Sequence, residues 1–268
     1  MSLKPSLSAT LVVCLFLTTP AWGQTPVPPG LAGPPPRELK TERPDATASG
    51  MPTLADPFRH YVGDLRRFIS VDTFAVVGIG GGLALAAHPW DGHTKQEARE
   101  HLLAQQGKFT GGNIGGMFLV QAAAGYTALA VGRSTGNRKV AWLGADLVRA
   151  QFLSQTVVQG LKYTTSRTRP DGSNDKSFPS GHTASATATA SVLQRYFGWK
   201  AGVPAYAFAA YVGASRIASD KHHLSDVLKG ATLGIAAGRT ITVGLAGEML
   251  DVGITPTVGG AAVMFTKR

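Results

Sequence analysis

Apolar and polar positions follow one another along the chain in long blocks rather than residue by residue. Beyond residue 57, seven mainly apolar stretches of helical length are separated by short polar breaks, at about 58–70, 73–88, 112–132, 138–163, 182–198, 202–217 and 223–247. No sustained alternation of apolar and polar residues, as in a strand, occurs before the last twenty residues. The pattern predicts an all-α fold, a helical bundle of about six core helices, with a tail over 250–268 that is compatible with a small hairpin.

Two further patterns support helices. The first stretch places its apolar residues on one stripe of an amphipathic helix, at Phe58, Val62, Leu65 and Ile69. Glycines recur at four-residue spacing in three stretches, as Gly78/Gly82, Gly112/Gly116 and Gly230/Gly234/Gly238. Small residues at this spacing let helix backbones approach closely, in membranes and in soluble bundles alike.

The composition narrows the class of protein. Of the 268 residues, 44% are apolar and 16% are charged, which supports a sizeable core and excludes a mainly disordered chain. The 26 basic and 16 acidic residues give a net charge of +10, which suits an anionic partner such as a phosphate or a lipid head group. The basic residues are dispersed and no aromatic series accompanies them, which argues against nucleic acid as that partner.

The N-terminal segment resembles an export signal. Lys4, the apolar run 11–17 and the small residues Ala21 and Gly23 match a signal peptide over 1–23, with a retained anchor as the alternative. The one cysteine, Cys14, lies inside this segment, so a cleaved chain has no disulfide and no cysteine-ligated metal. Repeated prolines over 24–57 predict an extended linker. The folded domain is therefore expected over 58–249, before the tail 250–268.

Three short blocks carry candidate chemistry. The first runs from Lys162 to Arg169 and Pro170 and gathers cations where a helix is expected to end. By itself, such a block is most simply a basic helix C-terminus. The second, Pro179-Ser180-Gly181-His182, is a turn before a run of small residues in helical register. A turn that leads into a helix presents free N–H groups to an anion, although a lone tetrapeptide indicates no more than an N-cap.

The third block is Ser215-Arg216, then His222 after five residues, and Asp226 after three more. A helix that begins near His222 puts His222 and Asp226 on one face. The carboxylate can then accept the Nδ1–H of the imidazole and leave Nε2 free as a nucleophile. Arg216 offers a planar pair of donors that matches phosphate oxygens. In isolation, a structural hydrogen bond between His222 and Asp226 explains the pair equally well.

Together, the blocks resemble the signature of the type 2 phosphatidic acid phosphatase/vanadium haloperoxidase superfamily, in order and with intact spacing. The resemblance covers about 60–247 and is firmest over 162–226. It implies a metal-independent phosphatase with a phosphohistidine intermediate. His222 would attack phosphorus, Asp226 would orient His222, and His182 would protonate the leaving oxygen and then activate water.

The resemblance assigns the remaining motif residues to the phosphoryl oxygens. Lys162, Arg169 and Arg216, with Ser180 and the Gly181 amide, would hold them, and no cofactor or metal is expected. The same pocket in this superfamily can hold vanadate and oxidise halides, so a vanadate-dependent haloperoxidase is one alternative. A non-catalytic anion- or lipid-binding membrane protein is another. His223 is expected to be only a neighbour of the nucleophile.

The sequence indicates less directly whether the enzyme is soluble or crosses a membrane. The superfamily includes lipid phosphatases with six spans and soluble secreted phosphatases. Only 109–132 is both long and free of charge, whereas 138–163 and 223–247 carry several charges, which slightly favours a soluble periplasmic form over a multispan one. We expect an exported enzyme, periplasmic or membrane-associated, with an outward-facing site. Its substrate would be a phospholipid, a pyrophosphate lipid or a small soluble phosphate ester, and the oligomeric state stays open.

Overall fold

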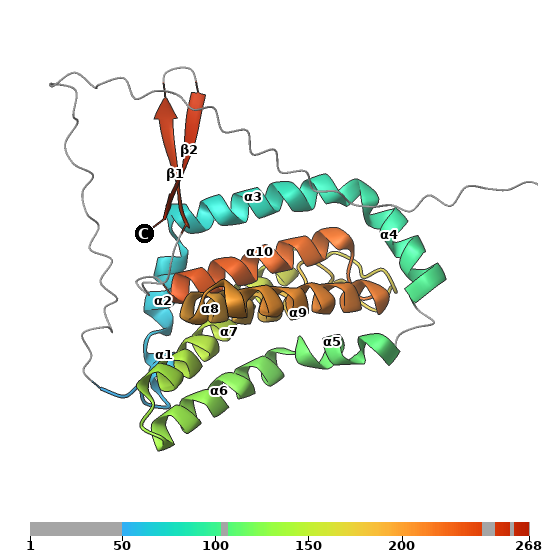
Figure 1. Ribbon diagram of the computed structural model, residues 1–268. Coiled ribbons are helices and arrows are strands. Elements are labelled where there is room, and N and C mark those ends of the chain that lie inside the picture. The colour runs from blue at the N-terminus through green and yellow to red at the C-terminus, as the bar shows by residue number, and fades with distance from the viewer. Residues whose placement is uncertain (1–49, 103–106, 243–249, 258–259, 268) are drawn as a thin grey trace, which may run out of the picture. The chain divides into compact units, whose positions relative to one another are not determined.

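The chain folds mainly into helices. The computed structural model describes residues 50–102, 107–242, 250–257 and 260–267 (Figure 1). The predicted signal peptide over 1–23 and the linker as far as residue 49 lie outside the described residues. Within them, helices occupy every stretch that the apolar pattern assigned to a helix, which confirms the all-α prediction for the domain.

The N-terminal half is broken into short and long helices. Its elements are α1 (Asp56–Arg59), α2 (Tyr61–Phe68), α3 (Val71–Ala87), the turn His88–Trp90, α4 (Asp91–Glu97), the wide helical turn Ala98–Leu102, α5 (Thr110–Gly115) and α6 (Phe118–Ser134). The predicted helix over 112–132 is in fact two, because the chain bends by 56° between α5 and α6. The break follows Gly115 and Gly116, and Met117 is extended at the start of α6.

The C-terminal half contains the long helices. They are α7 (Arg138–Thr165), α8 (Gly181–Phe197), α9 (Trp199–Ala218) and α10 (Leu224–Ile241). Side-chain caps begin two of them: Asn137 Oδ1 accepts the Val140 amide at α7, and Ser180 Oγ accepts the Thr183 amide at α8. The expected end of the last helix near 247 is wrong, because α10 ends at Ile241. There the hydroxyl of Thr242 donates to the Gly238 carbonyl at 2.7 Å and takes part in the final turn.

The tail forms two paired strands. Strand β1 (Leu250–Thr257) pairs antiparallel with β2 (Gly260–Lys267), with Leu250 opposite Lys267 and Thr257 opposite Gly260. This arrangement is the hairpin that the alternating pattern allowed.

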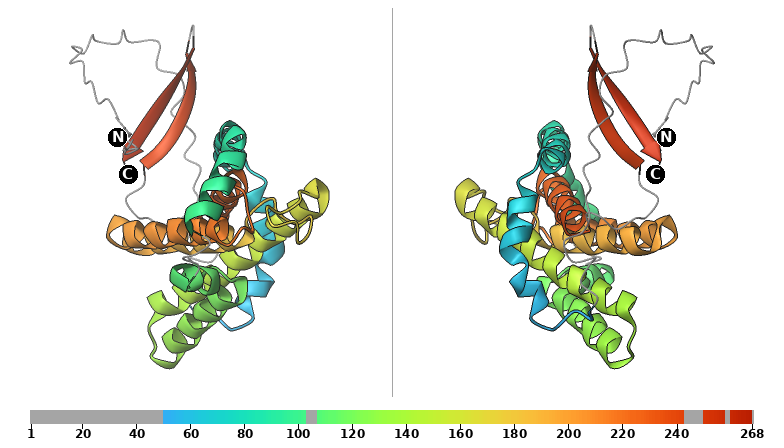
Figure 2. Two further views of the ribbon diagram at one scale, coloured as in Figure 1. Left: turned by 90° about the vertical axis from the view of Figure 1, so that its right-hand side faces the viewer. Right: turned by 90° about the vertical axis from the view of Figure 1, so that its left-hand side faces the viewer.

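The core lies around α7. Helices α6, α8 and α10 pack against it, and α3 runs beside α10 in the two side views (Figure 2). Small and branched apolar residues fill the space where α7, α8 and α10 meet: Ala150, Leu153, Ala188, Val192, Ala236 and Ala237. This packing fixes the end of α7 relative to the starts of α8 and α10, where the first two sequence blocks and the second half of the third lie.

The glycine spacing in α10 has a direct structural cause. A Cβ atom at Gly234 would lie 2.1 Å from the Ala184 carbonyl oxygen, and one at Gly230 would lie 2.3 Å from that of Ser180. Only glycine therefore permits α10 to lie this close to α8. The close contact at Gly230 sets the distance between the start of α10 and the turn that contains Ser180.

Helix α3 is apolar on all sides but is not a core helix. The continuous helical segment Val71–His101 is long and apolar enough to cross a membrane, and only 22% of its most apolar window is buried. Large exposed side chains along it include Phe74, Ile79, Leu83 and Leu85. The bent α5–α6 pair is a second candidate span if it is counted as one.

Candidate active site

The first block lies at the end of α7, as predicted. Lys162 belongs to the last turns of this helix and is buried, and its Nζ donates to the Lys176 carbonyl at 2.6 Å. Burial, together with the charges of Arg169 and Arg216, lowers the pKa of Lys162 to about 8. Lys162 therefore stays protonated at neutral pH, and a bound anion would stabilise that charge.

The second block forms the start of α8. Ser180 is fully buried, and its amide donates to the Asp226 carbonyl oxygen at 2.9 Å. Its Oγ caps the helix and lies 2.9 Å from the Thr183 hydroxyl. Gly181 and His182 follow as the first two residues of α8, where backbone N–H groups have no partner within the helix. Ser180 thus shapes this anion-binding helix end, in addition to its predicted contact with phosphate.

The third block surrounds the end of α9 and the start of α10. Arg216 lies in the last turn of α9, and its carbonyl accepts the amides of Lys221 and His222, which forms a tight turn. Helix α10 has its N-cap at His223, so His222 lies just before the helix rather than in it. Its ring is nevertheless only 3% exposed.

Asp226 is held from several sides. Its Oδ2 accepts the His223 amide at 2.9 Å and the Ser177 hydroxyl at 2.5 Å. The same oxygen lies 3.8 Å from His222 Nδ1, which is an ion-pair distance but longer than a hydrogen bond. The predicted pairing of His222 with Asp226 is therefore present in position, while the predicted hydrogen bond is not formed at this distance.

The three blocks meet at one cavity. This cavity has a volume of about 260 Å³ and is lined by Phe118, Gln155, Gln159, Lys162, Arg169, Gly181, His182, Arg216 and His222. Six of the eight predicted site residues line it directly. The other two, Ser180 and Asp226, lie behind it as the cap of α8 and the partner of His222.

Burial, assisted by the nearby cations, keeps both histidines neutral. Burial first, and then nearby Arg216, lowers the pKa of His182 to about 4. Burial and the charge of Lys162 lower the pKa of His222 to about 4 as well, against the opposing effect of Asp226. A neutral imidazole at His222 retains the lone pair that a nucleophile needs.

Asp226 is ionised in this environment. Burial opposes its charge, but its contacts with His222, Ser177, the His223 amide and Arg167 lower its pKa to about 2. The carboxylate can therefore stabilise positive charge on the neighbouring His222.

A second, larger cavity adjoins the first. It has a volume of about 650 Å³ and shares His182 and Arg216 with the smaller cavity; its other lining residues are Asn113, Ile114, Met117, Asp171, Ser219, Asp220 and Lys221. His182 thus lies between a cationic cavity and a roomier one with mixed polar and apolar walls.

Sequence analysis missed several residues of the site. Asn113 on α5 accepts a hydrogen bond from Arg216, and its backbone is also hydrogen-bonded to His182. Arg167 binds Asp226, and Asp91 binds Arg167. No motif marks Asn113 or Asp91, since each acts through a partner far away in the sequence. Arg167 lies inside the first block, but its contact with Asp226 spans 59 positions and was not predicted. His223, as expected, is not among the residues that line either cavity.

A metal centre was not expected from the sequence. Within residues 50–102 and 107–242 and the two strands, no group of three or more His, Cys, Asp or Glu residues is arranged to hold a metal ion. His88, for example, pairs with Asp91 at 2.9 Å instead.

Comparisons with known proteins agree with the signature. Residues 143–247 match the family model described as the PAP2 superfamily. The chain is 42% identical over 85 residues to the lipid A 1-phosphatase of Porphyromonas gingivalis, which covers 31% of this chain and 19% of that protein. The chain thus matches only about a fifth of the length of this curated relative.

Two solved structures are also similar to the chain. The crystal structure of Aquifex aeolicus LpxE is 27% identical and covers 45% of this chain and 80% of its own, with a TM-score of 0.36. The transmembrane PAP2 type phosphatidylglycerolphosphate phosphatase of Bacillus subtilis is 19% identical and covers 70% of this chain and 92% of its own, with a TM-score of 0.33.

Proposed function

We propose that the chain is a metal-independent phosphatase of the PAP2 type that acts through a phosphohistidine at His222, and the match of residues 143–247 to the PAP2 superfamily model supports this proposal. One observation carries the proposal: two neutral histidines, the buried His222 and the partly buried His182, line one cavity together with Lys162, Arg169 and Arg216. Phosphoryl transfer requires positioning and neutralisation of charge above all, and these cations supply both.

The reaction proceeds in two steps. His222 Nε2 attacks phosphorus, the bond from phosphorus to the leaving oxygen breaks, and that oxygen takes a proton from His182. Water then attacks the phosphohistidine, the bond between phosphorus and nitrogen breaks, and His182 takes the proton that the water loses. Asp226 stabilises the positive charge that His222 gains in the first step. In the second step His222 leaves phosphorus as a neutral imidazole.

The low pKa of His182 fits this cycle once a substrate is bound. In the free enzyme, burial and Arg216 disfavour the protonated ring. A bound phosphate dianion neutralises the surrounding cations and restores the proton that the leaving oxygen needs. Protonation of the acid is thereby coupled to occupancy of the cavity.

We propose a lipid phosphate as the substrate. The relative in Porphyromonas gingivalis is named for a lipid phosphate, although the match covers only part of it. The larger cavity lies on the side of His182 where a leaving group would be, and its wall includes the exposed apolar residues Ile114 and Met117. The head group would lie in this cavity, while its acyl chains extend along the apolar surface.

The same apolar surface supports a membrane-associated enzyme. Helix α3 exposes large apolar side chains on a helix that the bundle buries poorly, and a lipid bilayer would cover them. With the export signal predicted over 1–23, an enzyme that binds the outer face of the membrane through α3 without crossing it would have an outward-facing active site. This argument favours membrane association over the soluble form that the charge pattern slightly favoured.

Phosphate release tests the proposal. Wild-type protein and His222→Ala are assayed in EDTA with p-nitrophenyl phosphate and with detergent-dispersed phosphatidic acid. Turnover by the wild type alone, with inhibition by orthovanadate, is the expected result. Loss of activity in EDTA, or turnover by a well-folded His222→Ala protein, would overturn the metal-independent histidine mechanism. The ratio of the two rates tests the preference for lipid.

A further inference from the structure

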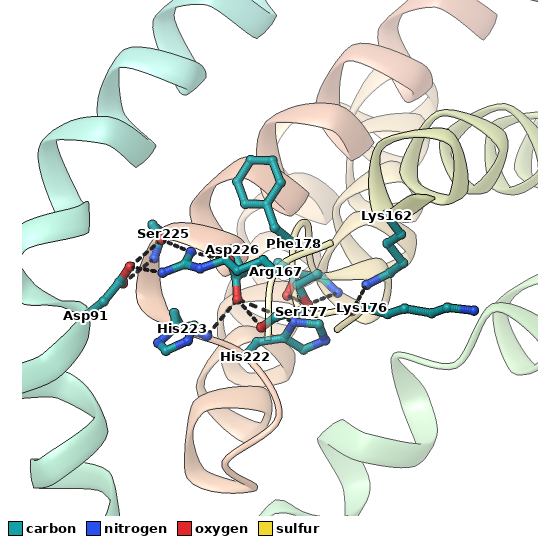
Figure 3. A network of polar contacts seen from close by, with 12 residues as sticks. Asp91, Lys162, Arg167, Lys176, Ser177, Phe178, His222, His223, Ser225 and Asp226 are labelled. Carbon is teal, nitrogen blue, oxygen red and sulfur yellow. Dashed lines mark hydrogen bonds and ion pairs between the residues drawn. The ribbon is translucent and has the colours of Figure 1, made fainter. Parts of the chain in front are cut away.

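A second carboxylate lies behind Asp226, and an arginine joins the two (Figure 3). Arg167 Nη1 donates to Asp226 Oδ1 at 2.6 Å, and its Nη2 donates to Asp91 Oδ2 at 2.7 Å. Asp226 is completely buried, the side chain of Asp91 is 6% exposed and that of Arg167 is 23% exposed. This chain of charges extends from His222 to the start of α4.

Asp91 also holds the start of α10. Its Oδ1 accepts the Ser225 amide at 2.9 Å, and its Oδ2 accepts the Ser225 hydroxyl at 2.6 Å. Ser225 is the residue just before Asp226, although it is 134 positions away from Asp91 in the sequence. Asp91 therefore caps α10 from a different helix and fixes the turn on which Asp226 lies.

Neither Asp91 nor Arg167 lines the cationic cavity or the larger one beside it. Any effect that they have on catalysis must therefore act through Asp226. Arg167 occupies Oδ1 of Asp226, which directs Oδ2 toward His222 and the groups around it.

We infer that Asp91 and Arg167 are positioning residues, which together fix the Asp226 carboxylate beside the nucleophile His222. This inference rests on the proposed phosphohistidine mechanism. Arg167 holds the carboxylate by its first oxygen, and Asp91 balances the charge of Arg167 and anchors the α10 turn. Because Asp91 begins the helix that follows α3 and its short connecting turn, the apolar segment is connected through Arg167 and Asp226 to the proposed nucleophile His222.

The charges in this network predict that loss of Arg167 and loss of the Asp91 charge change the pKa of His222 in opposite directions. Charged or titratable groups near Asp226 come from α7 (Lys162), from the segment after it (Arg167), from the turn and helix after α3 (His88 and Asp91) and from the α10 turn (His222 and His223). Without Arg167, the negative charge of Asp226 is less balanced and favours protonated His222. Without the charge of Asp91, Arg167 neutralises Asp226 more fully and disfavours protonated His222.

The test compares Arg167→Gln, Asp91→Asn and the double variant in full-length protein. Each single variant is expected to lower kcat about 10- to 100-fold, as loss of an outer partner of a site typically does, with little change in KM. The acid limb of the kcat profile should move to higher pH in Arg167→Gln and to lower pH in Asp91→Asn. The double variant should lie between them, and Arg167→Lys, which keeps the charge, should remain closer to the wild type.

Arg67→Gln provides the matched control. Arg67 is a half-exposed arginine in α2 that pairs with the buried Asp64. It lines neither cavity, and it is far in the sequence from the residues that do. Its loss should change stability and leave the pH profile of kcat unchanged. A merely structural role for Arg167 and Asp91 would shift both profiles alike or not at all, and either result would overturn the inference.

Titration of His222 by nuclear magnetic resonance separates this inference from the proposed function. The measurement requires no turnover, and the His222 pKa should rise in Arg167→Gln and fall in Asp91→Asn. An inactive wild type with these opposite shifts would refute the phosphatase while it preserves the charge network. An active wild type whose His222 pKa is the same in all variants would refute the network alone.

Discussion

Asn113 Oδ1 accepts a hydrogen bond of 2.6 Å from Arg216 Nη1, although the two residues are 103 positions apart in the sequence. The amide nitrogen of the same side chain donates to the Ser219 hydroxyl at 2.9 Å. The Asn113 backbone is also hydrogen-bonded to His182. A residue of the short helix α5 therefore connects Arg216, the arginine proposed to bind phosphate, with the proposed general acid.

Replacement of this amide should impair the enzyme without unfolding it. A hydrogen bond to a charged group contributes about 1.5–3 kcal/mol, so Asn113→Ala is expected to lower kcat/KM by ~10- to 100-fold. The measurement is steady-state hydrolysis of p-nitrophenyl phosphate. Asn137→Ala is the matched control, because Asn137 caps α7 away from the site. It should cost about 1 kcal/mol of stability and leave kcat/KM unchanged. Equal kcat/KM losses in both variants would contradict the assigned role of Asn113.

Binding of an anion should draw a proton into the site. His182 has a pKa of about 4 in the free protein, so it is neutral at pH 6. A phosphate dianion in the cavity raises that pKa, since it offsets Arg216 and the other cations. Calorimetry of inorganic phosphate binding at pH 6, in buffers with different ionisation enthalpies and with allowance for the proton that phosphate itself loses when it binds as the dianion, should therefore show proton uptake by the protein. This uptake should be largest between the His182 pKa of the free protein and that of the complex.

The variant His182→Asn identifies the group that takes up this proton. It should bind phosphate with much less proton uptake than the wild type, and His223→Asn should behave like the wild type because His223 does not line the cavity. Unchanged uptake in His182→Asn would assign the proton to another group, with His222 as the next candidate.

The catalytic half of the site could be predicted from the sequence because its spacing is local. His222 and Asp226 are four residues apart, and Ser180 to His182 form one helix start, so a short backbone segment fixes their relation. The hydroxyl of Ser180 shows the limit of such reasoning, since the structure uses it to cap α8.

The supporting half of the site depends on contacts that no local pattern encodes. Asp91 and Asn113 are ordinary polar residues in segments without a motif, and they reach the site only because α4 and α5 pack beside α9 and α10. The bend at Gly116 was missed for a related reason. The apolar run over 112–132 continues through it, and apolar content alone does not register a change in helix direction.

Close packing between α8 and α10 predicts a sharp difference between two glycines. A Cβ at Gly234 would lie 2.1 Å from the Ala184 carbonyl oxygen, whereas one at Gly160 on α7 would meet nothing within 4 Å. Gly234→Ala should therefore destabilise the protein by about 1–3 kcal/mol or more. Gly160→Ala should stabilise it by about 0.4–1 kcal/mol. Thermal unfolding in one detergent compares the two, and equal melting temperatures would contradict the close helix contact.

Exposed apolar residues on α3 predict how the protein binds lipid. Ile79 is 65% exposed on this helix, and a lysine there would have to enter the hydrocarbon at a cost of up to about 2.5–3.5 kcal/mol. Ile79→Lys should therefore reduce flotation of the protein with vesicles of phosphatidylcholine and phosphatidylglycerol. It should retain hydrolysis of the soluble p-nitrophenyl phosphate, because Ile79 does not line either cavity.

The matched control for this prediction is Val203→Lys on α9, where the valine is 62% exposed. Helix α9 lies outside the segments that are apolar and long enough to cross a membrane, so a charge there should leave flotation close to that of the wild type. Equal losses in the two variants would show that α3 has no special part in lipid binding. Unchanged flotation of Ile79→Lys would place α3 outside the bilayer, and its apolar surface would then require a protein partner to cover it.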